Sequence, residues 1–314
     1  MSPLRVLVTG TSGQIGTNLA LRLQREGHEV VGIDKLPNPW TEEIETEVRD
    51  LTTGIDGGDA FDVIAHLAAH AKVHELVEQP ERALENITMT FNVLEYSRAR
   101  RIPIVFSSSR EVYGDVHRFE GYGEATADFA FTESTYSASK IACEALIYSY
   151  ARCYELPYLV FRFSNVYGRY DSDLERMVRV LPMFTQQILR NEPITIYGGE
   201  AKTLDFTYVD DCVDGIVRGI EALVGGRVVN ETINLAYGEG NTLVRAAELI
   251  GRAVGREPAM TMAPALVGEV TYYVADISKA QELLRWAPTT PLVEGIPLAV
   301  ERWVAALEPS LREA

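Results

Sequence analysis

Tyr136 and Lys140 stand four residues apart in the run Tyr-Ser-Ala-Ser-Lys. Residues at this spacing lie on one face of a helix, so the phenol and the ammonium are expected close together. A neighbouring ammonium favours the phenolate, which would make Tyr136 a general base able to take a hydroxyl proton at neutral pH. On a solvated helix face the same pair would have no function, so the interpretation depends on what lies opposite.

Three serines, Ser107, Ser108 and Ser109, end a predicted strand. Three small hydroxyl residues in a row suit a buried core strand poorly. They suit the carboxyl edge of a parallel sheet, where open α/β folds bind their ligands. This position favours a catalytic interpretation of Tyr136 and Lys140.

A glycine-rich turn at residues 9–16 separates the first predicted strand from the first predicted helix. Gly10 would allow the tight turn, Gly13 the approach of a pyrophosphate, and Gly16 the close packing of helix on sheet. The helix N-terminus adds N–H groups and a positive dipole. Asp34 ends the second predicted strand, where a carboxylate accepts ribose hydroxyls and repels a 2′-phosphate. These features predict that the cofactor is NAD rather than NADP. The alternative is that the glycine-rich turn serves only packing.

The elements that must position these residues alternate along the first half of the chain. Strands are expected at residues 5–9, 30–34, 62–67, 102–107 and 158–163, and helices at 14–26, 81–101 and 136–154. Short β-branched runs between amphipathic helices indicate a parallel sheet covered on both faces. The sequence predicts an α/β fold with a Rossmann-type doubly wound parallel sheet and a smaller α/β C-terminal substrate lobe.

The second half has shorter elements, and no low-complexity linker separates it from the first. Residues 1–168 are expected to form an NAD-binding Rossmann domain to which later segments return. Residues 169–314 are expected to form mainly a substrate-binding lobe packed directly on it, with a cleft between. The expected elements are helices at 177–190 and 210–223, strands at 194–197 and 206–209, and further elements at 233–236, 242–254, 272–274, 278–284 and 293–306.

The composition limits the classes of function. The 314 residues are 46% hydrophobic and 24% charged, as in soluble globular proteins. A net charge of −16 argues against a basic surface for nucleic acid. The apolar run at residues 4–8 is too short for a signal peptide or a membrane span. We therefore expect a cytoplasmic protein that binds neither nucleic acid nor membrane.

No metal site is expected. The three cysteines show no CxxC spacing and cannot form a disulfide framework, which fits a reducing compartment. Histidines recur every four residues at His66, His70 and His74, but no carboxylate or cysteine framework accompanies them. The cysteines are Cys143, Cys153 and Cys212.

Together these motifs resemble those of the extended short-chain dehydrogenases/reductases. Within that group the chain is similar to the NAD-dependent sugar-nucleotide epimerase/dehydratase family, of the UDP-glucose 4-epimerase type, over nearly its whole length. The resemblance rests on residues 9–16, Asp50-Leu51, His66-Leu-Ala-Ala69, Asn86, Ser-Ser-Ser-Arg-Glu-Val-Tyr-Gly at 107–114, residues 136–140, Arg-Phe-Ser-Asn-Val-Tyr-Gly at 162–168, residues 205–211 and residues 275–279.

The resemblance implies NAD as the cofactor and assigns its contacts. Asp50 and Leu51 would flank the adenine, and Ala68 and Ala69 would line the cofactor groove. The full set implied or predicted for the cofactor is Gly10, Gly13, Gln14, Ile15, Gly16, Asp34, Asp50, Leu51, Leu67, Ala68, Ala69, Asn86, Ser107, Tyr136, Lys140 and Phe163.

The resemblance also implies the roles at the reacting sugar. Ser109 would hydrogen-bond the 4-hydroxyl, Tyr136 would be the base, and Lys140 would hold the nicotinamide ribose. Asn165 would contact the sugar or its phosphate. The substrate is expected to be a nucleotide sugar with UDP as its nucleotide, and a homodimer through the helices at 81–101 and 136–154 is expected from the same resemblance.

Glu111 departs from the pattern of the 4-epimerases, which more often carry a small or apolar residue at this position. Dehydratases and uronate decarboxylases of the family resemble this chain in having Glu before Val-Tyr-Gly. A carboxylate there could move a proton at C5 once C4 is a ketone. Dehydratases usually have Asp beside that Glu, however, and here Arg110 stands there. The alternative for Glu111 is an ion pair with Arg110 or another basic residue.

Two arginines that family members usually direct at the substrate diphosphate are replaced by Leu204 and Leu266. Arginine contacts to a diphosphate are bidentate and hard to replace. Either other cations take over, or the substrate is not an ordinary nucleotide diphosphate sugar, or those cations form a solvated face. We expect the first, with the substrate set Ser109, Arg110, Asn165, Arg169, Arg176, Arg179 and Lys202.

The sequence thus predicts an NAD-dependent sugar-nucleotide 4-epimerase that oxidises C4 transiently. One alternative is a 4,6-dehydratase or a uronate decarboxylase that uses Glu111. An alternative of another class is a non-catalytic NAD-binding regulator, against which Ser109, Tyr136 and Lys140 argue.

Overall fold

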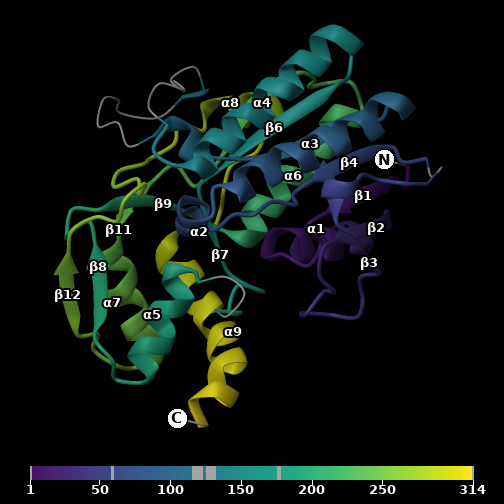
Figure 1. Cartoon of the computed structure of the whole chain (residues 1–314). Coiled ribbons are helices and arrows are strands. Elements are labelled where there is room, and N and C mark those ends of the chain that lie inside the picture. Colours follow the sequence, from purple (N-terminus) through teal and green to yellow (C-terminus); the bar gives the residue numbers. More distant parts are fainter. Residues whose placement is uncertain (1, 58–59, 115–122, 125–131, 175–177, 313–314) are drawn as a thin grey trace.

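The alternating elements of the first half assemble into one seven-stranded sheet (Figure 1). The computed structural model describes residues 2–57, 60–114, 123–124, 132–174 and 178–312. The strand order is β10-β6-β5-β4-β1-β2-β3, and all neighbours are parallel, which confirms the Rossmann-type fold class. The strands are β1 (Arg5–Thr9), β2 (Glu29–Asp34), β3 (Thr46–Val48), β4 (Val63–His66), β5 (Ile104–Ser109), β6 (Tyr158–Phe163) and β10 (Glu231–Leu235).

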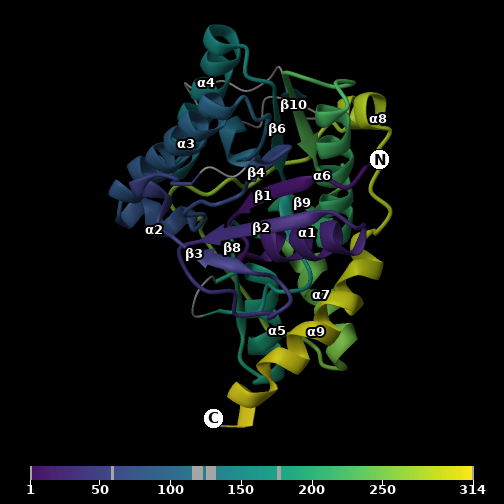
Figure 2. The ribbon, with the colours of Figure 1, turned by 90° about the vertical axis from the view of Figure 1, so that its right-hand side faces the viewer.

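Helices cover both faces of this sheet (Figure 2). On one face lie α1 (Gln14–Arg25), α6 (Val209–Val224) and α8 (Ser278–Leu284), and on the other α3 (Glu81–Arg100) and α4 (Thr135–Tyr154). The side chains of β1 alternate accordingly: Val6 and Val8 join the core with α1 and α6, and Leu7 joins the core with α3 and α4. Because both faces are buried, these strands are apolar at nearly every position.

A second, smaller lobe has its own core, built around Phe184, Ile194 and Trp303 (Figure 1). This lobe is not one continuous segment of the chain. After the chain first enters it, α6, β10 and α8 return to the first sheet. The lobe contains β7 (Asn165–Tyr167), β9 (Thr203–Tyr208) and β11 (Gly240–Thr242) in one sheet, β8 (Ile194–Tyr197) paired with β12 (Met260–Ala263), and the helices α5 (Val180–Leu189), α7 (Leu243–Val254) and α9 (Leu292–Arg312).

Several elements differ from the sequence-based expectation. β5 runs on to Ser109, and two of its serines have polar partners on α4: Ser108 Oγ donates to Glu144, and the carbonyl oxygen of Ser107 accepts from Lys140. α5 begins at Val180, with Pro182 in the first turn where a missing N–H costs nothing. At 272–274 the expected strand is reduced to a single bridge between Tyr272 and Thr203. Three short helices near the site were not expected: η1 (Leu51–Thr53), α2 (Val73–Glu78) and η2 (Arg110–Tyr113).

Candidate functional site

A cleft of about 830 Å³ opens where β1, β2, β4, β5 and β6 end and the second lobe begins. This is the edge at which parallel sheets bind ligands. Of the residues predicted from sequence, the cleft brings together Gly10, Gly13, Gln14, Ile15, Gly16, Asp34, Asp50, Leu51, Leu67, Ala68, Ala69, Ser107, Ser109, Arg110, Glu111, Tyr136, Lys140, Phe163, Asn165 and Arg179.

The turn between β1 and α1 leaves room for a phosphate group. A Cβ on Gly10, where φ is +81°, would lie 2.7 Å from the nitrogen of Ala68, and a Cβ on Gly16 would lie 2.0 Å from the oxygen of Gly10. A Cβ on Gly13 would meet only that oxygen, at 3.3 Å. The buried side-chain amide of Gln14 has no hydrogen-bond partner at either polar atom. Such an orphaned amide beside a helix N-terminus fits a pyrophosphate ligand.

Asp34 is fixed at the end of β2 by two backbone groups. Its Oδ2 accepts the N–H of Ser12 and its Oδ1 accepts the N–H of Leu36, both at 3.0 Å. A carboxylate has about four acceptor sites, so it can take ribose hydroxyls in addition. The ammonium of Lys35 lies 3.2 Å from Asp50. Lys35 therefore serves Asp50 and not the carboxylate that repels a 2′-phosphate.

Ser109, Tyr136 and Lys140 meet at the cleft from β5 and α4. A capping box built on Ser134 starts α4 and so sets Tyr136 in its first turn. Lys140 Nζ donates to the carbonyl oxygen of Ser107 at 2.7 Å and lies 5.9 Å from the centroid of the Tyr136 ring. A hydrogen bond joins the side chains of Ser109 and Tyr136. The arrangement places a hydroxyl, a phenol and an ammonium at one point of the cleft.

The protonation of this trio differs from the expectation. Burial raises the pKa of Tyr136 to about 12, although the hydrogen bond with Ser109 opposes the rise. Burial lowers the pKa of Lys140 to about 8. Burial therefore dominates the pKa of Tyr136 here, and the ammonium of Lys140 donates to the carbonyl oxygen of Ser107.

Arg110 and Glu111 line the cleft from η2, directly after Ser109. Their ion pair joins Nη2 to Oε1 at 2.9 Å, and the two side chains are only 11% and 7% exposed. The guanidinium also lies 5.7 Å from the ring of Tyr273. The charge of Glu111 contributes to the raised pKa of Tyr136, so this carboxylate lies near the candidate base.

Each of the cations expected to hold the diphosphate is paired with a carboxylate, as far as the structure describes them. In the cleft, Arg179 Nε lies 2.5 Å from Asp171 Oδ1. Lys202 Nζ lies 2.6 Å from Glu269 Oε1, but Lys202 is 3% exposed and does not line the cleft. The direct substrate contact predicted for Lys202 stays a prediction, to which its place behind the cleft lining lends no support. Arg176 lies outside the described residues.

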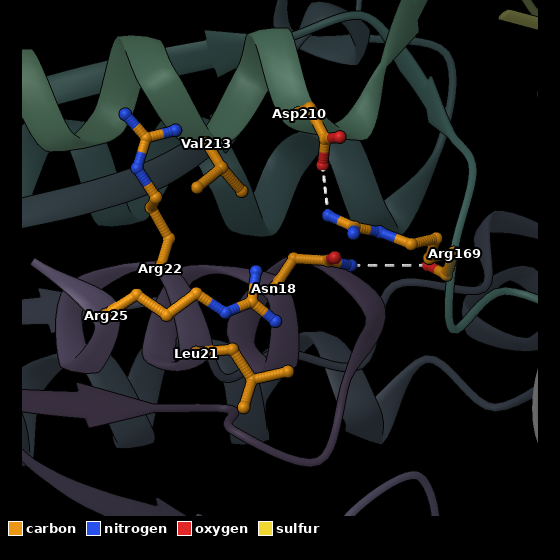
Figure 3. A pocket seen from close by; sticks show the side chains of 7 residues that line it. All are labelled: Asn18, Leu21, Arg22, Arg25, Arg169, Asp210 and Val213. Atoms are coloured by element: carbon orange, nitrogen blue, oxygen red, sulfur yellow. Dashed lines mark hydrogen bonds and ion pairs between the residues drawn. The ribbon is translucent and has the colours of Figure 1, made fainter.

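Arg169 faces a separate pocket of about 160 Å³ between α1 and α6 (Figure 3). Its guanidinium binds Asp210, and its carbonyl oxygen accepts the side-chain N–H of Asn18 at 3.3 Å. The chain turns at Tyr170, where φ is +60°, and Tyr170 and Asp171 face the cleft instead. The substrate contact predicted for Arg169 stays a prediction, to which its place in the smaller pocket lends no support.

Asn86 also stands behind the cleft wall. Its Nδ2 donates to the oxygen of His70 at 3.0 Å and to Ser139 Oγ at 3.2 Å, and its Oδ1 accepts the N–H of His70 at 2.8 Å. The amide is thus used to fix the loop at His70, which lines the cleft, between α3 and α4. The direct contact with the cofactor predicted for Asn86 stays a prediction, and the hydrogen bonds in the structure support the cleft wall.

Sequence reasoning missed Trp40, Tyr170 and Asp171 in the cleft. Trp40 Nε1 donates to the oxygen of Ser12 at 3.2 Å, and its ring centroid lies 5.8 Å from that of Tyr170. An aromatic residue in the loop after Asp34 was a usable signal. Of the two leucines found in place of arginine, Leu266 lines the cleft and Leu204 is buried in the core of the second lobe.

His66, the first of the three histidines spaced by four residues, serves structure, whereas His70 and His74 line the cleft. His66 is buried, with Nδ1 2.7 Å from the Thr9 hydroxyl and Nε2 3.2 Å from that of Thr90, and burial lowers its pKa to about 3. Among the residues that the structure describes, no group of three or more His, Cys, Asp or Glu side chains could hold a metal ion. Every helix among the residues that the structure describes is too short or too polar to cross a membrane.

A glycine-rich turn before a helix, a carboxylate at the end of β2 and a Ser-Tyr-Lys trio at one cleft are the features of a dinucleotide-dependent enzyme of the short-chain dehydrogenase/reductase type. The chain belongs to the NAD dependent epimerase/dehydratase family, whose model matches residues 6–236. NAD is the cofactor of this family.

Relatives match along nearly the whole chain. "Uncharacterized UDP-glucose epimerase YtcB" of Bacillus subtilis is 30% identical over 93% of this chain and 96% of its own length. "UDP-glucuronic acid decarboxylase 1" of Danio rerio is 28% identical over 97% of this chain and 73% of its own.

Solved structures also match the fold over nearly the whole chain. The UDP-glucose 4-epimerase of Thermotoga maritima with UDP-glucose has a TM-score of 0.86 and 28% identity, covering 97% of this chain and all of that one. The UDP-glucose 4-epimerase of Thermus thermophilus in complex with NAD has a TM-score of 0.84 and 27% identity, covering 96% of this chain and all of that one.

Proposed function

We propose that this protein is an NAD-dependent sugar-nucleotide 4-epimerase acting on a UDP-linked hexose. The observation that carries the proposal is the meeting of Ser109, Tyr136 and Lys140 beside the dinucleotide cradle. The similarity to proteins named as UDP-glucose 4-epimerases supports the choice of reaction.

In this proposal Tyr136 takes the proton of the 4-hydroxyl and later returns it, while Ser109 hydrogen-bonds the same oxygen. NAD, held at the glycine-rich turn and by Asp34, would supply the acceptor for the C4 hydride and a positive charge in the cleft. That charge favours the phenolate form of Tyr136, whose pKa burial otherwise raises to about 12. Lys140, held by Ser107, lies where it can fix the nicotinamide ribose. Turning the 4-ketone over before hydride returns gives the epimer.

The test is incubation with UDP-glucose or UDP-galactose in deuterated water. The expected product is the 4-epimer without deuterium at C5 or C6, because epimerisation leaves the C5 hydrogen in place. Tyr136→Phe should abolish cofactor reduction by substrate while retaining bound NAD and the wild-type circular dichroism spectrum. Bound NAD without turnover of any sugar nucleotide would favour the regulator instead.

A second candidate is a uronate decarboxylase or a 4,6-dehydratase in which Glu111 moves the C5 proton. The observation in its favour is the buried position of Glu111 in the cleft near Tyr136. Deuterium at C5 with loss of activity in Glu111→Gln would establish this branch. Release of carbon dioxide from UDP-glucuronate would identify the decarboxylase within it.

We also propose a cytoplasmic homodimer that pairs through α3 and α4. Leu84 and Phe91, seven residues apart on α3, are 66% and 45% exposed, and all three cysteines are free, as in a reducing compartment. Analytical ultracentrifugation should show a dimer that Leu84→Glu dissociates. An unchanged mass in that variant would contradict the interface.

A further inference from the structure

The cleft contains a buried carboxyl group for which the proposed reaction has no use. Asp171 follows Tyr170 on the cleft wall, and its side chain is only 1% exposed. Neither of its oxygens has a partner that meets hydrogen-bond geometry. An ionised carboxylate is costly in such a place unless a positive charge compensates it.

Arg179 supplies that charge. Its Nε lies 2.5 Å from Asp171 Oδ1, and within the described chain it is the one charged group that acts on Asp171. Burial raises the pKa of Asp171 to about 7, although Arg179 opposes the rise. Arg179 itself is 32% exposed and lines the cleft, so it can also reach a ligand there.

A diphosphate needs the same guanidinium. The two arginines expected for it are replaced by Leu204 and Leu266, and the other predicted cations that the structure describes are engaged: Arg110 with Glu111, Lys202 with Glu269, and Arg169 outside the cleft with Asp210. If Arg179 turns to a diphosphate, Asp171 is left buried with no cation paired to it among the described residues. A buried carboxyl group in that state binds a proton.

We propose that Asp171 is a further residue of the substrate site, which competes with the substrate diphosphate for Arg179 and takes up one proton when the diphosphate binds. The proposal rests on the proposed function. The proton comes from solvent and goes to the Asp171 carboxylate, Arg179 keeps its charge throughout, and no covalent bond changes.

The sign of the pH dependence follows by linkage. Below the pKa of Asp171 in the free enzyme the carboxyl group is already protonated, Arg179 is available, and affinity is highest. Above it, binding must draw a proton from solution, so the dissociation constant should rise about tenfold for each pH unit. His70 and His74 also line the cleft, so the proton must be assigned by a variant.

The experiment is titration calorimetry of UDP-glucose into the NAD-loaded Tyr136→Phe protein, which cannot turn the probe over. It is done from pH 6.0 to 8.5 in two buffers of different ionisation enthalpy. We expect uptake of about one proton at pH 8 and the tenfold slope above the pKa. Asp171→Asn in this background should take up no proton and bind equally at all pH values, with higher affinity at pH 8.5.

Two further variants keep the proposal falsifiable. Asp210→Asn breaks a matched pair with Arg169 that faces the other pocket, and should keep the wild-type slope. Arg179→Gln should bind more weakly and without proton uptake, even if Asp171→Asn fails to fold. The inference alone would be overturned if the protein that keeps Asp171 bound UDP-glucose with an affinity independent of pH and took up no proton on binding. Lack of binding of UDP-glucose and of other sugar nucleotides at every pH would overturn the proposed function with it.

Discussion

Glu144 on α4 holds Arg162 on β6 through both carboxylate oxygens, with Nε 3.0 Å from Oε1 and Nη2 2.7 Å from Oε2. Ser108 Oγ donates to the same Oε1 at 2.5 Å, and the hydroxyl of Tyr148 donates to Oε2 at 2.7 Å. Glu144 stands one turn after Lys140. The pair therefore ties β5, β6 and α4 together directly beside Ser109, Tyr136 and Lys140.

Glu144→Gln should be strongly destabilising. It leaves the guanidinium of Arg162, which is 5% exposed, without its buried counter-charge, and the expected loss in the free energy of unfolding is about 3–5 kcal/mol. Urea denaturation followed by circular dichroism measures it. The matched control is Glu95→Gln. The bidentate pair of Glu95 with Arg98 lies at the surface, so its loss should lower the free energy of unfolding far less. Equal losses in both variants would contradict the importance of burial.

Lys140→Met should stabilise the fold while abolishing activity. The pKa of Lys140 falls from 10.5 to about 8 on burial, so below pH 8 the folded state carries a charge penalty of roughly 3 kcal/mol. Between these two pKa values the unfolded chain binds more protons than the folded one, so wild-type stability should rise with pH there. Chemical denaturation at pH 7 and pH 9.5 should show this rise in the wild type and not in Lys140→Met. A less stable variant at pH 7 would show that the bond to Ser107 outweighs the penalty.

The parts of the site that sequence predicts are those set by local geometry. The turn at Gly10 and the four-residue spacing of Tyr136 and Lys140 depend on one strand end or one helix, and the structure places them together as expected. What the sequence could not predict is the pairing of charges distant along the chain. Lys202 with Glu269 depends on tertiary packing, as does the turn that sends Arg169 to the far side of α1.

Asp34→Ala should weaken the binding of NAD far more than the binding of NADP. The variant loses the acceptor for the ribose hydroxyls and also the repulsion of a 2′-phosphate. Loss of charged hydrogen bonds of about 1.5–3 kcal/mol corresponds to a rise of roughly 10- to 150-fold in the dissociation constant of NAD. Fluorescence titration of the cofactor-free protein measures both affinities. Asp56→Ala, which removes a fully exposed carboxylate, is the control and should change neither.

Arg179→Ala and Arg169→Ala should separate the cleft from the pocket of Figure 3. Arg179 lines the cleft, so its loss removes a cation that holds the diphosphate in both ground and transition states. KM for UDP-glucose should therefore rise about 10-fold or more while kcat changes little, as expected when uniform binding is lost. Arg169 binds Asp210 on the far side of α1, so Arg169→Ala should leave KM within about twofold of wild type. A steep rise in KM for Arg169→Ala with none for Arg179→Ala would mean that the diphosphate approaches from the side of the smaller pocket, and the assignment of Arg179 would be wrong.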